Sequence, residues 1–154
     1  MSAPRCFKLW HIMVSGVRRM EGHIIICGLG RVGRKVAAIL KEHNIQFVII
    51  DSNPEIKELV DELGYKLMTG DATSEKMLLS ADIDKAKGLV AAMDNDAKNL
   101  FVVITARKLN RELFICTRTR DDMVIDKFRE AGANFIVNAL RSAVDEILGE
   151  LAKG

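Results

Sequence analysis

A glycine-rich loop is the segment of this sequence best suited to bind a ligand. Residues 24–33 read Ile-Ile-Ile-Cys-Gly-Leu-Gly-Arg-Val-Gly, so an apolar run leads directly into the spacing Gly-x-Gly-x-x-Gly. Gly28 allows a tight turn, Gly30 lets the backbone approach phosphates, and Gly33 lets a following helix pack closely on the strand. Free N–H groups at the helix start attract an anion. The predicted phosphate loop consists of Gly28, Leu29, Gly30, Arg31, Val32 and Gly33.

An acidic residue ends the next apolar run. Asp51 follows the run at 47–50 and lies 18 residues beyond Gly33. A carboxylate at this position accepts hydrogen bonds from both ribose hydroxyls of an adenosine, each worth roughly 1.5–3 kcal/mol. The same charge repels a 2′-phosphate, which disfavours NADP. We place Asp51 and the adjacent Ser52 in the site, while an ordinary acid before a helix is the alternative.

A short loop after the third apolar run is suited to the adenine end of a nucleotide. Asp71, Ala72 and Thr73 follow Gly70 in this loop. Asp71 or Thr73 could instead cap the following helix, and the two roles are compatible.

Charged residues at the ends of other runs extend this set. Arg31 would oppose the dipole of its helix, so it is interpreted as a phosphate clamp rather than a solvated side chain. Asp94 edges the same crevice, next to residues that cap the following helix. Arg118 and Arg120 either reach phosphates or pair with the acids at 121–122, and we favour the pairing.

Composition and charge describe a soluble globular protein. The 154 residues are 49% hydrophobic and 29% charged, with a net charge of +2. Residues 1–22 carry +3 and the remainder carries −1, so there is no bulk field for nucleic acid. No apolar run approaches the roughly 18–20 residues of a membrane span. The three cysteines show no pairing pattern, which fits a reducing cytoplasm.

The sequence lacks the usual patterns of metal binding and of catalysis. His11, His23 and His43 are scattered, with no cysteine or carboxylate at ligand spacing. Tyr65 has no lysine four residues later, so the Tyr-x-x-x-Lys pair of short-chain dehydrogenases is missing. No Ser/His/Asp or Cys/His arrangement suggests a nucleophile. We therefore expect neither a metal site nor an enzyme.

Strand and helix patterns alternate from residue 23 onward. This alternation predicts a Rossmann-like α/β fold, a doubly wound six-stranded parallel sheet of order 3-2-1-4-5-6, with the ligand at the carboxyl ends of strands one and four. The expected strands are 23–27, 46–51, 65–69, 88–92, 113–117 and 134–137. The expected helices are 31–43, 54–63, 74–81, one from 94–96 to 108, one from 121–122 to 132, and one from 139 onward.

Three parts of the chain are expected. Residues 1–22 form a basic linker or appendage, and residues 23–138 form a single nucleotide-binding lobe. Residues 139–154 form a carboxyl-terminal helix with one apolar side. A single-lobe subunit and a piece of a longer chain both fit this layout.

With these residues in place, the chain resembles the RCK/KTN (TrkA-N) regulatory domains of potassium channels and Trk/Ktr-type potassium transporters. The combination of the glycine loop with the later segments is more specific than the glycine loop alone. The matching pieces, spread over about 23–150, are 28–33, Asp51, Gly-Asp-Ala-Thr at 70–73, Asp-Asn-Asp-Ala-Lys-Asn at 94–99 and Arg-Glu-Ala-Gly-Ala-Asn-Phe-Ile-Val at 129–137.

The resemblance implies a non-catalytic sensor that binds ATP, ADP, AMP or NAD(H) and gates a potassium channel or transporter from the cytoplasmic face of the cell membrane. It also implies dimers through the last helix, assembled into a higher ring, and an Arg31 that contacts terminal phosphates. Calcium-gated members carry carboxylates where this chain has Ala92, Thr117 and Thr119, so no calcium site is expected. An NAD-dependent oxidoreductase and a redox-sensing repressor are the alternatives, although 1–22 is too short for a helix-turn-helix.

Overall fold

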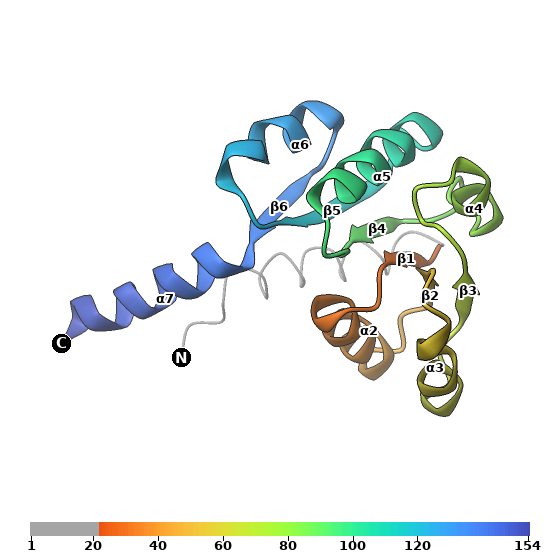
Figure 1. Ribbon diagram of the computed structural model, residues 1–154, viewed down its shortest axis with the longest axis horizontal. Coiled ribbons are helices and arrows are strands. Elements are labelled where there is room, and N and C mark those ends of the chain that lie inside the picture. The colour runs from red at the N-terminus through yellow and green to blue at the C-terminus, as the bar shows by residue number, and fades with distance from the viewer. Residues whose placement is uncertain (1–21) are drawn as a thin grey trace.

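A six-stranded parallel sheet lies at the centre of the computed structural model, which describes residues 22–154 (Figure 1). The strand order β3-β2-β1-β4-β5-β6 confirms the predicted order and the doubly wound α/β fold. The expectations for residues 1–21 lie outside the described residues. The strands are β1 (Ile24–Cys27), β2 (Phe47–Asp51), β3 (Leu67–Thr69), β4 (Gly88–Ala91), β5 (Phe114–Thr119) and β6 (Phe135–Asn138).

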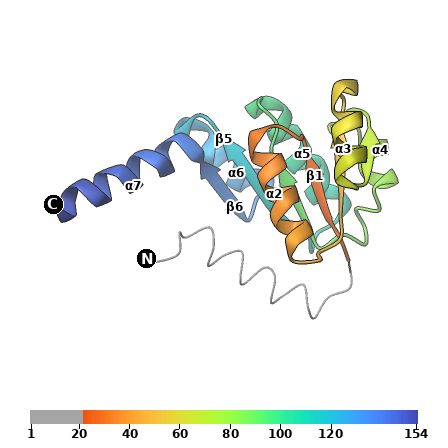
Figure 2. The same cartoon turned by 90° about the horizontal axis from the view of Figure 1, so that it is seen from below.

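Helices cover both faces of this sheet. The first two described helices, α2 and α3, pack on one face, and α4, α5 and α6 pack on the other, whereas α7 extends away from the sheet (Figures 1 and 2). Two 3₁₀ turns, η1 (Pro54–Ile56) and η2 (Asp122–Val124), precede α3 and α6. The helices are α2 (Arg31–Glu42), α3 (Lys57–Leu63), α4 (Glu75–Ser80), α5 (Asp96–Leu109), α6 (Ile125–Ala131) and α7 (Ala139–Lys153).

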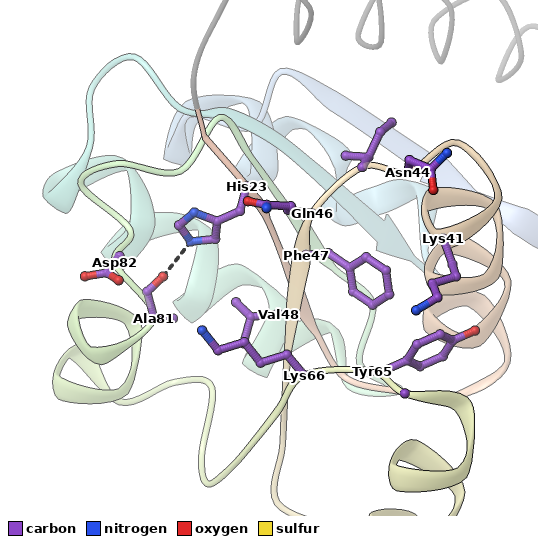
Figure 3. A pocket seen from close by; sticks show the side chains of 12 residues that line it. His23, Lys41, Asn44, Gln46, Phe47, Val48, Tyr65, Lys66, Ala81 and Asp82 are labelled. Atoms are coloured by element: carbon purple, nitrogen blue, oxygen red, sulfur yellow. Dashed lines mark hydrogen bonds between the residues drawn. The ribbon is translucent and has the colours of Figure 1, made fainter.

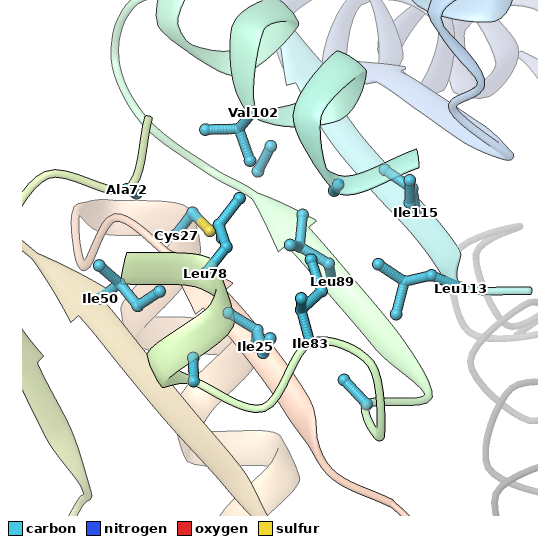
Figure 4. Packing of buried hydrophobic residues seen from close by; sticks show 14 of the residues in the cluster. Ile25, Cys27, Ile50, Ala72, Leu78, Ile83, Leu89, Val102, Leu113 and Ile115 are labelled. Atoms are coloured by element: carbon cyan, nitrogen blue, oxygen red, sulfur yellow. The ribbon is translucent and has the colours of Figure 1, made fainter. Parts of the chain in front are cut away.

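Strand β1 is buried from end to end because helices cover both of its faces. Each of its residues is at most 1% exposed. Since side chains alternate along a strand, Ile24 and Ile26 pack with residues of α2 and α3. Ile25 and Cys27 point the other way, into the larger cluster beneath α4, α5 and α6 (Figure 4). This burial fixes the end of β1, from which the glycine loop departs.

Some element boundaries differ from the predicted ones for identifiable reasons. Strand β5 continues to Thr119, two residues beyond the predicted end, because Arg118 and Thr119 pair with Val137 and Asn138 of β6. The Thr119 hydroxyl also donates to Asp96 Oδ2 at 2.6 Å, and the Arg120 N–H donates to the same carboxylate. The helices expected from 54 and from 121–122 each begin with a 3₁₀ turn. Gly64 and Gly132 end α3 and α6 in the left-handed conformation, close to the predicted helix ends at 63 and 132.

The last helix, α7, contacts the rest of the domain near its amino-terminal end and is exposed along its length. The Asn138 side chain caps it by accepting from the Arg141 N–H, and the Arg141 guanidinium donates to Asp122 at 2.7 Å. Within residues 22–154, no helix has the length and apolarity needed to cross a membrane. The exposed apolar side chains of α7 are Leu140, Val144, Ile147, Leu148 and Leu151.

Candidate functional site

The glycine loop connects β1 to α2 at the carboxyl edge of the sheet. Gly28 has φ +95°, and a Cβ there would lie 2.8 Å from Met93 Cγ. A Cβ on Gly33 would overlap the Gly28 carbonyl oxygen, so α2 approaches the end of β1 this closely only because residue 33 is a glycine. At Gly30 the nearest atom to such a Cβ is Asp94 Oδ2, 4.0 Å away, which leaves room for an approaching group.

The start of α2 differs from the other helix starts. Gly30, the residue before α2, has an extended backbone and no side chain to cap the helix. Within residues 22–154, each of the other helices and 3₁₀ turns that follow an extended residue is capped by the side chain of that residue. The first turn of α2 also lacks an acidic residue, and the exposed side chain of Arg31 lies there. Its first N–H groups are therefore open to an external anion. The capping residues elsewhere are Asn53, Ser74, Asn95, Asp121 and Asn138.

Asp51 connects the glycine loop to the end of β2. Its Oδ2 accepts from the Leu29 N–H at 2.7 Å, and its Oδ1 accepts from the Asn53 N–H at 2.8 Å. A carboxylate oxygen can accept a second hydrogen bond. The backbone thus holds the carboxylate in one orientation, and each oxygen keeps acceptor capacity for a ligand hydroxyl.

A cavity of about 340 Å³ lies beside this carboxylate, between the loops that follow β1, β2, β3 and β4. Three aspartates and one lysine give its rim a net negative charge, which suits a neutral nucleoside better than a bare anion. Among the predicted residues, those that line the cavity are Gly28, Asp51, Ser52, Asp71, Ala72 and Asp94. The other lining residues are Ile50, Gly70, Met93, Asn95 and Lys98. The predicted residues outside the lining are Leu29, Gly30, Arg31, Val32, Gly33, Thr73 and Arg118.

The loop after β3 is organised by Asp71. Its Oδ1 accepts from the Thr73 hydroxyl at 2.7 Å and from the Thr73 N–H at 2.9 Å. These hydrogen bonds, the hydroxyl first, lower the pKa of Asp71 below its ordinary value. Ser74 caps α4 instead of Asp71 or Thr73. Asp71 is therefore a fixed carboxylate on the rim of the cavity.

The predicted pairing of Arg118 and Arg120 with the acids at 121–122 is wrong. Both arginines donate to Asp94 Oδ1, from Arg118 Nη1 at 3.0 Å and from Arg120 Nη2 at 3.2 Å. The longer β5 explains the change, because residues two apart on an extended chain face the same side. Asp121 caps η2 instead, and Asp122 binds Arg141.

Two residues that the sequence analysis did not place in the site support it from α5. Lys98 lines the cavity. Asn99 is fully buried; its side chain accepts from the Met93 N–H at 3.0 Å and donates to the carbonyls of Met93 and Arg118. The sequence contained a signal for Asn99, because this polar residue lies one helical turn after the capping Asn95 within the segment 94–99.

The positions that would carry calcium ligands are occupied by small side chains. Ala92, Thr117 and Thr119 are buried, and the Thr117 and Thr119 hydroxyls donate to neighbours within the chain. Within residues 22–154, no group of histidine, cysteine and carboxylate side chains is arranged to hold a metal ion.

A larger hollow of about 520 Å³ lies at the opposite, amino-terminal end of the strands (Figure 3). His23 Nε2 lies 2.7 Å from the Ala81 carbonyl oxygen there. The Phe47 and Tyr65 rings pack edge to face, with their centroids 5.2 Å apart. Lys41 and Lys66 on its rim are exposed. None of the predicted site residues lines it.

Known sequences resemble most of this chain. The family model of the TrkA-N domain matches residues 24–139. Potassium channel protein 1 of Methanocaldococcus jannaschii is 40% identical over 124 residues, which cover 79% of this chain and 37% of that protein. The glutathione-regulated potassium-efflux system protein KefC of Enterobacter sp. strain 638 is 35% identical over 112 residues, which cover 73% of this chain and 18% of KefC. The chain thus spans less than half the length of these relatives.

Solved structures share the fold. The TrkA-N domain of the inner membrane protein ybaL from Escherichia coli has a TM-score of 0.80 at 27% identity and covers 84% of this chain and 96% of that one. The AMP-bound Kef CTD of Shewanella denitrificans has a TM-score of 0.71 at 29% identity, over 84% and 81% of the two chains. The GsuK channel bound to NAD has a TM-score of 0.70 at 26% identity, over 77% and 21%. GsuK bound to ADP has a TM-score of 0.69 at the same identity, over 77% and 31%. The chain belongs to the TrkA-N domain family, and it is related to the RCK domains of potassium channels and to the regulatory domains of Kef efflux systems.

Proposed function

We propose that this chain is a nucleotide-sensing regulatory domain of a potassium channel or transporter, which binds NAD(H) or an adenine nucleotide without consuming it. The observation that carries the proposal is the pairing of an uncapped helix start at Gly30 with the Asp51 carboxylate beside one cavity. The bound ligands of the related structures, NAD, ADP and AMP, all contain an adenosine 5′-phosphate.

The geometry supports a definite orientation of such a ligand. The ribose would rest on Asp51, whose oxygens keep acceptor capacity, and the adenine would lie toward Asp71 and Ala72 after β3. The phosphates would then point to Gly30 and the free N–H groups of α2, with Arg31 at their outer side. In this orientation, backbone amides rather than lysines hold the phosphates.

A binding role suits the site better than an enzymatic one. The cavity lining contains no histidine, cysteine or tyrosine among the described residues. Cys27, the nearest thiol along the chain, is fully buried, and burial raises its pKa to about 12. The alternative is an NAD-dependent oxidoreductase, for which the lining offers no histidine or tyrosine as proton donor, although it contains carboxylates and Lys98. NADH turnover with a carbonyl compound would favour that alternative.

The exposed apolar stripe of α7 supports self-association. Leu140, Ile147, Leu148 and Leu151 are each more than half exposed along one helix, and such a stripe marks an interaction surface. We propose that a second copy covers it in a homodimer, and that such dimers form a ring on the cytoplasmic side of the membrane protein. A ligand would then act by its differential affinity for two states of that assembly.

Calorimetry on ligand-stripped protein tests the binding proposal. We expect heat with at least one of AMP, ADP, ATP, NAD and NADH, and none with NADPH at matched concentration. Asp51→Ala should abolish or weaken this signal, whereas Asp126→Asn, which removes a carboxylate paired with Arg129 on α6, should leave it unchanged. If calorimetry detects no heat of binding when any of the five ligands is added to the wild-type protein, the proposal is contradicted.

A further inference from the structure

Arg118 is a mostly buried cation with a single, exposed anionic partner. Its side chain is 15% exposed, while the side chain of Asp94 is 71% exposed. Within residues 22–154, Asp94 provides its only ion pair. A buried guanidinium needs a compensating negative charge, so the arginine is the fixed member of this pair and the carboxylate is the replaceable one.

The Asp94 carboxylate lies over the glycine loop. Oδ1 accepts from Arg118 and Arg120, and Oδ2 is the atom nearest to a Cβ built on Gly30, at 4.0 Å. Gly30 also precedes the uncapped N–H groups of α2. A phosphate that arrives at these amides therefore meets a negative charge at short range, which repels it.

The backbone on both sides of Asp94 is held by hydrogen bonds, while the Asp94 side chain is exposed. The backbone before it is held by Asn99, which accepts from the Met93 N–H at 3.0 Å and donates to the Met93 carbonyl at 2.8 Å. The residue after it, Asn95, caps α5 by accepting from the Lys98 N–H at 2.9 Å. The loop can keep its path while the exposed carboxylate rotates into solvent.

We propose that Asp94 is an internal anion that occupies Arg118 and Arg120 in the empty site, and that a ligand phosphate displaces it. The inference rests on the proposed nucleotide site and assigns Asp94 a role opposite to that of a ligand contact. Asp94 opposes the binding of phosphate groups, and it thereby sets how much each added phosphate improves affinity. Its removal should strengthen the binding of phosphate-rich ligands.

The test compares adenosine, ADP, ATP and inorganic pyrophosphate on wild type and Asp94→Asn by calorimetry at low salt. The amide of this variant would keep an oxygen that can accept from Arg118, so the fold should survive, which circular dichroism and thermal melting check. We expect the variant to bind ADP, ATP and pyrophosphate about fivefold more tightly, because one like charge is removed from beside the glycine loop. Adenosine affinity should be unchanged. Asp126→Asn, the matched loss of an arginine-paired carboxylate on α6, should change none of these affinities.

A second variant separates displacement from simple charge removal. Arg118→Gln should lower ADP affinity by about tenfold, the effect of one charge-assisted hydrogen bond, and should leave adenosine unaffected. The inference is overturned if Asp94→Asn weakens ADP binding, or if the ratio of ADP to adenosine affinity is the same in wild type and variant. If adenosine and ADP do not bind but pyrophosphate binds Asp94→Asn more tightly, the proposed function fails and the inference stands. If nothing binds to either protein, both fail.

Discussion

Asp51 accepts a hydrogen bond from the backbone N–H of Leu29 at 2.7 Å, which joins the end of β2 to the middle of the glycine loop. The two segments are 22 residues apart in sequence. The same carboxylate that we expect to hold the ribose therefore also shapes the phosphate loop. Substitutions at Asp51 should affect both ligand affinity and the stability of the loop.

Asp51→Ala should weaken the binding of NAD or ADP by about tenfold to a hundredfold, because two charge-assisted hydrogen bonds to the ribose are lost. It should also lower the thermal midpoint, since the N–H groups of Leu29 and Asn53 lose their acceptor. Asp51→Asn keeps one acceptor oxygen and should lower the midpoint less. Calorimetry and thermal melting of both variants check this, and unchanged affinity in Asp51→Ala would remove the residue from the site.

Arg31→Gln should weaken ATP binding more than AMP binding. Arg31 lies exposed in the first turn of α2, beyond the amides that would hold the inner phosphates, so only a longer phosphate chain reaches it. The measurement is the ratio of dissociation constants for ATP and AMP in variant and wild type. Arg129→Gln is the control, because Arg129 pairs with Asp126 on α6 and contacts none of the loop residues named here. An equal loss for both nucleotides would show that Arg31 acts on the whole site.

Gly33→Ala should destabilise the protein by about 1–3 kcal/mol, because the added methyl overlaps the Gly28 carbonyl where α2 packs on β1. Gly149→Ala is the matched control in α7, where a Cβ meets nothing within 4 Å. That change should stabilise α7 by about 0.5–1 kcal/mol, since alanine favours a helix more than glycine does. Urea denaturation of the two variants gives both values, and equal effects would refute the close packing.

Burial raises the pKa of the Cys27 thiol from 9.0 to about 12. The unfolded chain loses this proton at lower pH than the folded chain, so stability falls as the pH rises above 9.0. The expected slope is about 1.4 kcal/mol per pH unit between the two values. Cys27→Ala should lose this part of the slope in urea titrations between pH 9.0 and roughly 10.5, within the window that the pKa shift defines. At pH 8, a thiol-alkylating reagent should leave the buried Cys27 unmodified until urea unfolds the chain, and peptide mapping detects the modification.

Leu148→Glu should convert a dimer into a monomer, because it places a charge within the exposed stripe of α7. Sedimentation analysis of wild type and variant measures the change in mass. Glu146→Gln changes a charge on the same helix outside the stripe and should leave the mass unchanged. A wild-type chain that sediments as a monomer at high concentration would contradict the α7 interface.

The sequence was sufficient to predict the sheet because its signals are local. Glycines at 28, 30 and 33 and the buried run of β1 define the loop, and Gly64 and Gly132 mark helix ends by their left-handed backbone. The order of the strands followed from right-handed crossovers. These features depend on neighbours in the chain, and the structure confirmed them.

The ion pairs could not be predicted because they join distant segments. Asp94 and Arg118 are 24 residues apart, and their contact depends on β5 extending to Thr119. That extension pairs Thr119 with Asn138 of β6, and Asp96 of α5 accepts from the Thr119 hydroxyl and the Arg120 N–H. Sequence periodicity indicates which apolar side chains are buried, but it does not indicate which acid an arginine pairs with. The prediction that Arg118 and Arg120 pair with the acids adjacent in sequence was therefore wrong.

Because α7 is held near its first turn and is exposed along its length, a small rotation at its start would move its far end by a larger distance. Asp122, which follows Arg120 by two residues, holds Arg141 at 2.7 Å and the Asn138 side chain at 3.1 Å. The 15 residues of α7 extend from this pivot over roughly 22 Å at 1.5 Å per residue. A tilt of about 10° at the pivot would displace the far end by roughly 4 Å over that length. A rotation of α7 too small to disturb the sheet would thus displace the carboxyl-terminal end of α7 by several ångströms.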